Sequence, residues 1–313
     1  MRIGVDILGG DFAPEATVHG SILAYQELKD KAKLVLFGNQ DQIHALCREA
    51  GFDASVFEIV HTTEHIGMDE YPAKAFKEKP NASIVLGFKH LHAGNIDGFG
   101  SAGNTGAMLV GAMHIVKSIP GVIRPCITAP IPKDSEKPTL VLDAGLNPDI
   151  KPDVMYQYAI LGSLYAELVF HIENPRVALF NIGAEEEKGN LLTKATYQAM
   201  KGTKDFNFVG NVEGTDLFSN DVDVIVCDGF VGNTILKGAE AFYKLIRKRK
   251  IKDDFFNRFD FTNYGGTPVL GINAPAIIAH GISNDKAIKN MILHTATVIE
   301  SKLTEKIKQA FGE

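Results

Sequence analysis

The sequence has few cysteines, no excess of basic residues and no long apolar run, and each of these features argues against a class of protein. Three cysteines among 313 residues, without metal-ligand spacing, make a disulfide framework unexpected. A formal charge of −6 argues against nucleic-acid binding, which normally needs an excess of basic side chains. No apolar run approaches the ~20 residues of a membrane-spanning helix, and no signal-peptide h-region follows Met1. We therefore expect a cytoplasmic protein that does not bind nucleic acid.

Signature motifs of several catalytic classes are missing as well. The sequence contains no G-x-S-x-G nucleophile elbow, no H-E-x-x-H zinc motif and no cluster of cysteine and histidine. It also lacks the G-x-G-x-x-G fingerprint of a dinucleotide site and the lysine of a Walker A loop. A nicotinamide-dependent dehydrogenase and a nucleoside triphosphatase are therefore disfavoured. The sequence favours chemistry by positioning and electrostatic stabilisation, with no cofactor and no metal.

What the sequence does contain is a regular alternation of short apolar runs, glycine-containing loops and longer helix-like segments. The runs have consecutive apolar residues, as strands buried on both faces of a parallel sheet do. They are residues 3–5, 34–37, 57–60, 140–142, 177–180, 206–209 and 224–226. The helices expected between and after them are residues 17–29, 41–50, 104–118, 154–171, 191–201, 234–249 and 285–310. This alternation predicts βαβ units and an α/β fold, in one domain that covers residues 1–313.

A basic segment at residues 244–252 breaks the pattern and begins a short helical excursion near 244–262. Six of its nine residues are lysine or arginine. One interpretation is a solvated helix end, whose cations lie near the negative end of the helix dipole. The other is a docking surface for an acidic protein or an anionic membrane, beside a small apolar face of Phe255, Phe256 and Phe259. The sequence leaves both interpretations open.

Two glycine-containing loops, each next to a short apolar segment, are candidate anion sites. In an open parallel sheet, ligands bind at the carboxyl ends of the strands, where such loops lie. The first loop starts at Asp6 and includes Gly9 and Gly10, which let the backbone approach an anion, although glycines in a βα turn are commonly structural. The second loop leads into a helix and either binds phosphate or only caps that helix. Its candidate ligands are Ser101, Gly103, Asn104, Thr105 and Gly106.

Two later loops carry further candidates. Asp143 and Asn147 follow the run 140–142 and form either the wall of a site or a plain turn. After the run 177–180 come three consecutive carboxylates, which are typical of a solvated helix start. The next residue, Lys188, is different, because an ammonium there could balance an incoming phosphate or a developing oxyanion.

The last candidates lie in the C-terminal third of the chain. Asp228 and Asn233 follow the run 224–226, where Asp228 either orients a lysine or caps a helix. His280 follows an apolar segment and is either a phosphate donor or a core histidine. The sequence does not decide between these alternatives.

At these loops the sequence resembles the bacterial phosphate acyltransferase family. The matching motifs occur in the family's order across nearly the whole chain, and the pair formed by residues 101–107 and 228–233 is highly specific. The motifs are residues 5–11, 66–73, 101–107, 124–125, 143–147, 186–189, 228–233, 264–266 and 279–281.

The resemblance implies transfer of a long-chain acyl group from the thioester of acyl carrier protein to inorganic phosphate, which gives acyl-phosphate for phospholipid synthesis. It implies a three-layer Rossmann-like sandwich similar to isocitrate and isopropylmalate dehydrogenases, with a mostly parallel sheet and no redox cofactor. It also implies a homodimer at the inner face of the membrane, in loose contact beside the glycerol-3-phosphate acyltransferase that consumes acyl-phosphate. It assigns catalysis to Lys188 and Asp228. The chain departs from the family at Ile7, Leu8 and Leu146, and its segment at 244–262 is shorter than the hairpin by which relatives contact the membrane.

Two other functions stay open beside this one. A phosphotransacetylase-like enzyme would move an acyl group between coenzyme A and phosphate. A non-catalytic scaffold would bind the carrier protein through residues 244–252. The catalytic hypothesis makes a geometric prediction, namely that residues 101–106, Lys188 and Asp228 converge at one edge of the sheet.

Overall fold

The apolar runs form strands in the structure, a computed structural model that describes residues 1–312. By its internal contacts the chain divides into two compact units. Unit 1 comprises residues 1–118 and 261–304, and unit 2 comprises residues 119–260 and the residues from 305 on. Each unit has its own set of strands and helices. The expectation of one domain over the whole chain stays a prediction.

Unit 1 is built on strands in the order β3-β2-β1-β4-β11-β10. The first five run parallel, and β10 is antiparallel to β11. Parallel pairing brings the carboxyl ends of β1, β4 and β11 to the same edge. The strands are β1 (Arg2–Asp6), β2 (Lys33–Gly38), β3 (Glu58–His61), β4 (Gly98–Ser101), β10 (Thr267–Leu270) and β11 (Ala276–Ile278).

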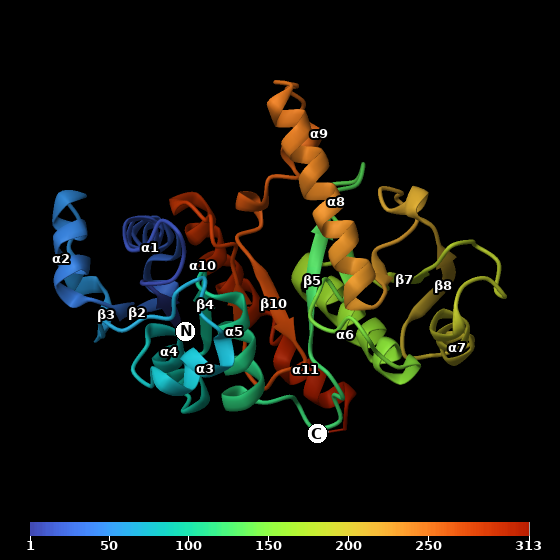
Figure 1. Cartoon of the computed structure of the whole chain (residues 1–313), viewed down its shortest axis with the longest axis horizontal. Helices are drawn as coiled ribbons and strands as arrows, with labels where there is room; N and C mark the ends of the chain where they lie inside the picture. The colour runs from blue at the N-terminus through green and yellow to red at the C-terminus, as the bar shows by residue number, and fades with distance from the viewer. Residues whose placement is uncertain (313) are drawn as a thin grey trace. The chain divides into compact units, whose positions relative to one another are not determined.

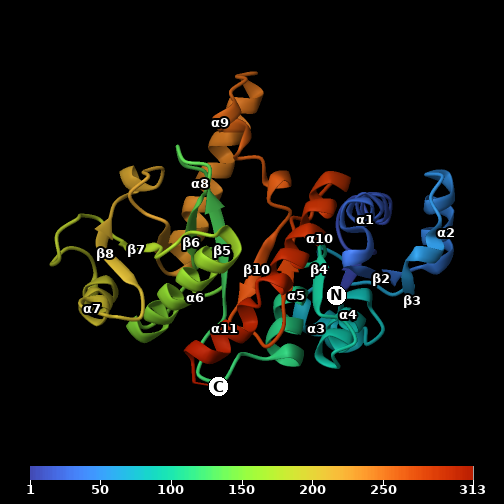
Figure 2. The same ribbon diagram turned by 180° about the vertical axis from the view of Figure 1, so that it is seen from behind.

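Helices cover both faces of the strands of unit 1. The helices α1 and α10 pack together on one face, and α4 packs on the other face with α3 and α5 beside it (Figures 1 and 2). The helices are α1 (Glu15–Leu28), α2 (Gln40–Glu49), α3 (Pro72–Glu78), α4 (Ser83–His92), α5 (Thr105–Gly111) and α10 (Asp285–Glu300). Burial on both faces explains why these strands have consecutive apolar residues rather than alternating ones.

Unit 2 repeats this arrangement with strands in the order β5-β6-β9-β7-β8. Here β6, β9, β7 and β8 are parallel, and β5 is antiparallel to β6. The carboxyl ends of β6, β9 and β7 therefore share one edge. The strands are β5 (Cys126–Ile131), β6 (Thr139–Leu142), β7 (Arg176–Phe180), β8 (Asn207–Val212) and β9 (Val224–Val226).

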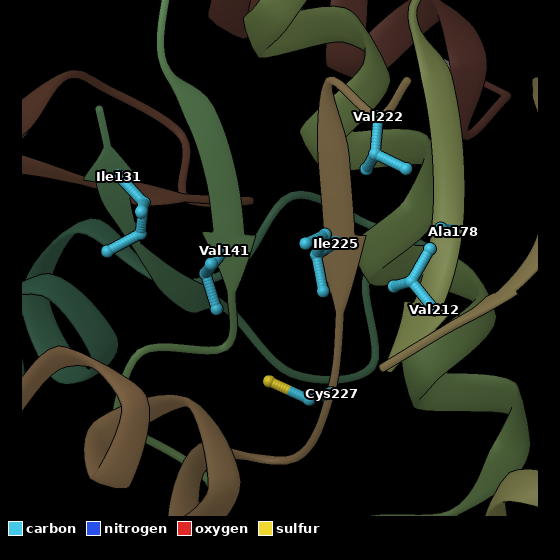
Figure 3. Packing of buried hydrophobic residues seen from close by; sticks show 7 residues of the cluster. All are labelled: Ile131, Val141, Ala178, Val212, Val222, Ile225 and Cys227. Carbon is cyan, nitrogen blue, oxygen red and sulfur yellow. The ribbon is translucent and has the colours of Figure 1, made fainter. Parts of the chain in front are cut away.

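The side chains of the unit 2 strands alternate between two helical layers. Leu142 and Val224 lie against Gly162 of α6, which leaves room for them because it has no side chain. On the opposite face, Val141 and Ile225 belong to a buried cluster (Figure 3) against which residues of α8 pack. The helices are α6 (Pro152–Phe170), α7 (Leu191–Met200), α8 (Gly229–Lys248), α9 (Asp254–Asn257) and, near the end of the chain, α11 (Leu303–Ala310).

The expected α/β fold is confirmed, and each of the seven expected strands has a counterpart. The strands that the sequence analysis missed are β4, β5, β10 and β11, which are short or contain glycine or proline. Helices α3 and α4 were also missed. The helix expected over 285–310 is broken, because Lys302 has a left-handed φ of 54° between α10 and α11. Within residues 1–312, no helix is both long and apolar enough to cross a bilayer.

A buried ion pair ties the strands of unit 2 together. Lys133 is 2% exposed, and its ammonium donates hydrogen bonds to Val222 O at 2.6 Å and to Asp223 Oδ1 at 2.9 Å. Asp223 also accepts from the guanidinium of Arg176. Burial opposes ionisation of Asp223, but the two cations outweigh it and lower its pKa to about 2. This carboxylate is therefore ionised in the folded chain at any pH above about 3.

We expect Asp223→Asn to destabilise the fold strongly, because it leaves the ammonium of Lys133 buried without a counter-charge. The free energy of unfolding at pH 7, measured by urea denaturation, should fall by about 3–5 kcal/mol. Because the pKa of Asp223 is lower in the folded state, the wild type should lose this stabilisation as the pH falls from about 4 to 2, and the variant should not. The control is Glu240→Gln in the partly exposed pair with Lys237, which should cost under ~1 kcal/mol. Equal effects of the two substitutions would contradict this account.

Candidate active site

A buried aspartate organises the loops at the carboxyl edge of unit 1. Asp6, the last residue of β1, is 1% exposed and accepts a hydrogen bond of 2.6 Å from Ser101 Oγ at the end of β4. The same hydroxyl accepts from Gly103 N at 2.9 Å. Burial raises the pKa of Asp6, although hydrogen bonds from Ser101, Ser83 and Leu8 N oppose the rise. Asp6 and Ser101 thus hold two neighbouring loops together, and neither side chain faces solvent.

The loop after β1 packs closely against the loop after β4. A Cβ on Gly9 would lie 2.2 Å from Asp6 Oδ2 and 2.8 Å from Gly103 N, so only glycine fits at this position. Asp11 N donates to Gly281 O at 2.8 Å, which joins the loop after β11 to the same group. Three separate segments of unit 1 therefore meet at one edge, with several of their backbone groups side by side.

The polar loop that precedes α5 divides into residues that hold structure and residues that face outward. The Asn104 side chain caps α5 by accepting from Ala107 N at 3.0 Å, and its amide donates to Gly67 O and Glu70 O. By contrast Thr105 is exposed and Gly106 is half-buried. The first N–H groups of a helix have no acceptor within it, so those of Thr105 and Gly106 can bind an anion. Capping and anion binding are compatible in this loop.

His280 lies at the same edge of unit 1, just after β11. Its side chain is exposed, so it is not a core histidine. The ring packs against Phe261 with 5.1 Å between ring centroids, and Nδ1 accepts from Ile282 N at 3.4 Å. The structure thus leaves the imidazole at the surface beside the loop that contacts Asp11.

A second buried aspartate organises the corresponding loop in unit 2. Asp143 follows β6 and is 0% exposed, and both oxygens of its carboxylate accept hydrogen bonds from the backbone. Its donors are Ile127 N, Gly145 N, Leu146 N, Asn147 N and Asn147 Nδ2, at 2.6–3.3 Å. Burial raises the pKa of Asp143 against the effect of these bonds. Asp143 therefore shapes its loop and does not face solvent.

The loops after β6 and β9 are joined by backbone hydrogen bonds. Asp143 N donates to Cys227 O at 3.0 Å, and Gly229 N donates to Asn147 O at 2.8 Å. Asp228 is the N-cap of α8, and its side chain accepts a hydrogen bond from Val231 N at 2.9 Å. Capping is thus one role that this residue has in the structure. The exposed Asn233 lies one turn into α8, close to the loop after β6.

Lys188 projects from the third loop at this edge, which follows β7. Its side chain is exposed, and its Cγ lies 2.8 Å from where a Cβ of Gly183 would be, so the stem of the lysine packs over this glycine. Asn181 secures the loop by donating to Lys188 O at 3.1 Å. No hydrogen bond or ion pair joins Lys188 to Asp228 in the structure of residues 1–312. Their shared edge follows from the parallel pairing of β7 with β9.

The structure thus groups the candidate residues by unit. Asp6, the glycines after it, residues 101–106 and His280 lie at the strand edge of unit 1, and the other candidates lie at the strand edge of unit 2. Convergence of the two groups on one substrate stays a prediction. Within residues 1–312, no group of three or more histidine, cysteine or carboxylate side chains could hold a metal ion.

Sequence reasoning missed the structural partners of these loops. The carbonyl oxygens of Gly67 and Glu70 accept hydrogen bonds from the side-chain amide of Asn104. Glu70 also forms an ion pair of 2.6 Å with Lys79. Gly183 was not singled out, although it makes room for Lys188. The only available signal was that residues 66–73 lie within a motif of the family that the sequence resembles.

Comparison with known proteins identifies the family of this chain. Residues 1–306 match the model of a family described as "Fatty acid synthesis protein". A phosphate acyltransferase from Dictyoglomus turgidum is 39% identical over 332 aligned positions, which cover 100% of this chain and 98% of that protein. One from Thermoanaerobacterium thermosaccharolyticum is 40% identical and covers 99% of this chain and 96% of its own.

Solved structures with the same fold are more distant in sequence. A phosphotransacetylase from Streptococcus pyogenes superimposes with a TM-score of 0.67 at 16% identity, covering 96% of this chain and 94% of its own. A branched-chain phosphotransacylase from Enterococcus faecalis gives a TM-score of 0.64 at 13% identity, with 96% and 99% coverage. These two similarities establish a Rossmann-like fold. Sequence identity over the full length establishes the family, and the chain therefore belongs to the fatty acid synthesis protein family of phosphate acyltransferases, enzymes of the acyltransferase class.

Proposed function

We propose that this chain transfers a long-chain fatty acyl group from the thioester of acyl carrier protein to inorganic phosphate and releases acyl-phosphate. The observation that carries the proposal is the set of polar loops at the carboxyl edges of parallel strands in a chain of the phosphate acyltransferase family. In open α/β sheets this edge is where ligands bind.

The proposed reaction needs little besides positioning and charge stabilisation. A phosphate oxygen attacks the thioester carbonyl, an acyl–oxygen bond forms, the carbon–sulfur bond breaks, and the thiolate leaves. Because a thiolate is a good leaving group, orientation and stabilisation of the oxyanion supply most of the acceleration. No cofactor or metal takes part in the proposed steps.

The proposed phosphate ligands are side chains and backbone groups of the loops at the strand ends. In unit 1 these are the side chain of Thr105, the N–H groups of Thr105 and Gly106, and the imidazole of His280. The backbone of Gly9 and Gly10 completes this set. Asp6, Ser101 and Asn104 support these groups by fixing the loops from beneath.

The proposed catalytic groups lie in unit 2. Lys188, with its exposed ammonium, neutralises the phosphate or the tetrahedral oxyanion. Asp228 positions the phosphate or Lys188 from the start of α8, and Asn233 contacts the substrate one turn later. The mechanism requires that the loops of both units act on the same substrate, which is part of the proposal.

The proposal extends to partners and location. Acyl carrier protein docks on the exposed basic side chains between Lys244 and Lys252, and two copies of the chain form a homodimer, as the family resemblance implies. Sedimentation velocity would give the mass of the assembly. The cytoplasmic location, in contact with the inner face of the membrane beside a glycerol-3-phosphate acyltransferase, is likewise part of the proposal.

A comparison of acyl donors tests the proposed function directly. We expect acyl-phosphate to form from palmitoyl carrier protein and phosphate with a kcat/KM at least ~100-fold above that for acetyl-coenzyme A, because a pocket gains several kcal/mol by burying a long chain. Hydroxylamine trapping measures the acyl-phosphate. A preference for acetyl-coenzyme A would instead identify a phosphotransacetylase. Carrier binding without loss of the thioester would identify a scaffold.

We expect Lys188→Ala to lower kcat by about 10²–10³-fold, because the charge that stabilises the oxyanion is lost. The side chain is exposed, so circular dichroism and the thermal midpoint should match the wild type. Lys194→Ala is the matched control, since this lysine is exposed on the following helix. Wild-type turnover by the Lys188 variant would remove this residue from the mechanism.

The carrier-docking surface makes a separate prediction. Replacing Lys244, Arg249 and Lys252 by glutamine should raise the KM for the acyl carrier protein about tenfold, since each exposed charge contributes a few tenths to 1 kcal/mol. The KM for a small pantetheine thioester should not change, and the effect should shrink at high salt. A control variant removes three other exposed lysines, Lys74, Lys77 and Lys204. If both variants raise the KM equally, the effect is one of net charge and the docking surface lies elsewhere.

A further inference from the structure

Arg124 lies at the carboxyl edge of the parallel strands of unit 2, although it precedes a strand instead of following one. Because β5 is antiparallel to β6, with Thr128 paired with Leu142, the start of β5 lies beside the end of β6. Arg124 comes two residues before β5. It therefore belongs to the same edge as the loops of Lys188 and Asp228, and the proposed mechanism gives it no task.

Hydrogen bonds to the loop after β6 hold Arg124 in place. Asn147 Nδ2 donates to Pro125 O at 2.8 Å, and Arg124 Nη1 donates to Asp149 O at 3.0 Å. The same loop contacts the start of α8, where Gly229 N donates to Asn147 O at 2.8 Å. A continuous line of contacts thus joins Arg124 to the N-terminus of α8.

The guanidinium of Arg124 keeps N–H groups that can bind a ligand. A guanidinium has several N–H donors in a planar fork. Within residues 1–312, the bond to Asp149 O is the one hydrogen bond that this side chain makes, and no carboxylate there forms an ion pair with it. The side chain is exposed. An arginine that is oriented by one bond and has its other donors exposed is suited to a phosphate group.

Apolar side chains accompany this cation. Ile123, the residue before Arg124, is 51% exposed, and Leu146 in the neighbouring loop is half-buried. Ile123 N donates to Gln157 Oε1 at 2.8 Å, which anchors the backbone at this point. A cation beside exposed apolar surface fits the end of a pantetheine arm, where the phosphate is followed by a carbon with geminal methyl groups. Inorganic phosphate has no such apolar part.

The spacing between Arg124 and Lys188 also fits such an arm. The strands lie in the order β5-β6-β9-β7, so β5 and β7 are three strand spacings apart, or about 14 Å. Arg124 precedes β5 and Lys188 follows β7 at the same edge. A pantetheine arm with its amide groups is as long as an extended peptide of four to five residues, about 14–17 Å. Its phosphate can therefore lie at Arg124 while its thioester lies at Lys188.

We infer that Arg124 binds the phosphate group at the end of the donor's pantetheine arm and so favours phosphorylated donors. The inference rests on the proposed function and adds a binding residue to it. Coenzyme A and acyl carrier protein both carry this phosphate, so the assignment holds for either donor. The alternative is that Arg124 binds the inorganic phosphate that accepts the acyl group, and the two assignments differ in which KM the residue controls.

Donors with and without the phosphate test the inference. We expect Arg124→Gln to lower the ratio of kcat/KM for palmitoyl phosphopantetheine over palmitoyl pantetheine about tenfold, because a charge-assisted contact with the phosphate is lost. The loss should appear in the KM of the phosphorylated donor and not in its kcat. Arg124→Lys keeps the charge but not the planar fork and should lower the ratio only about threefold. The side chain is exposed, so the thermal midpoint of both variants should match the wild type.

Two further measurements separate this result from others. Arg48→Gln is the matched control, because this arginine is exposed on α2 in unit 1, and it should leave the ratio unchanged. Calorimetric titration of phosphopantetheine and of pantetheine into the whole protein gives a readout that needs no catalysis. The wild type should bind the phosphorylated compound about tenfold more tightly, and Arg124→Gln should bind the two compounds equally.

Several outcomes would overturn the inference. An unchanged donor ratio in Arg124→Gln would do so, and a higher KM for inorganic phosphate at an unchanged ratio would assign Arg124 to the acceptor. An effect seen with palmitoyl carrier protein but not with palmitoyl phosphopantetheine or palmitoyl-coenzyme A would assign it to the surface of the carrier. Equal losses with both pantetheine donors and a lower thermal midpoint would leave Arg124 a structural role only. If the wild type forms no acyl-phosphate from any thioester, the proposed function fails, while the titration still decides whether Arg124 binds the phosphate of the arm.

Discussion

Two buried carboxylates, one at a strand end in each unit, are the constraint on which the rest of the site depends. Asp6 binds Ser101 across neighbouring strands, and Asp143 gathers the backbone of its own loop. Both are buried, and burial raises the pKa of each. Removing a carboxyl group from water is costly, so each must be compensated by the hydrogen bonds that fix the loops. These hydrogen bonds hold the two loops in place, because the two carboxyl groups would otherwise be unsatisfied.

This arrangement separates the residues that build the site from those that can act in it. Asp6, Ser101, Asn104 and Asp143 are buried, and their polar atoms are engaged within the chain. Lys188, Thr105, Asn233 and His280 are exposed. A fixed framework with a few exposed polar groups suits a reaction that needs positioning more than a strong nucleophile of the enzyme's own.

An apolar groove along α8, lined on its other side by Phe218 and Phe259, gives unit 2 a second feature beside these polar loops. Its wall is a face of α8, and the same helix begins at Asp228. One helix thus begins at the proposed catalytic end, lines the groove and ends in a basic segment.

Sequence reasoning found most of the fold because buried parallel strands are read from runs of apolar residues. It missed β4, since Gly98–Ser101 contains two glycines, and it missed β11, since the short strand Ala276–Ile278 directly follows a proline. The loops after β1, β6, β7 and β9 were found because they follow expected strands, and the loop at residues 101–106 was found from its glycines and polar side chains. The sequence could not tell ligands from supports. Asn104 and Thr105 are neighbours of similar polarity, yet one is buried and bonded and the other is exposed. The groove depends on contacts between distant segments, such as Phe218 with Phe259, which no local pattern predicts.

The most direct measurement of the central claim follows the oxygen atoms of phosphate. The protein is incubated with a long-chain acyl thioester and phosphate fully labelled with heavy oxygen, and the products are examined by mass spectrometry. If phosphate is the acyl acceptor, every labelled oxygen is retained in acyl-phosphate, and thioester loss equals acyl-phosphate formed and stops when phosphate is omitted. Loss of the thioester to free fatty acid at the same rate without phosphate would contradict the account, because water and not phosphate would then be the acceptor.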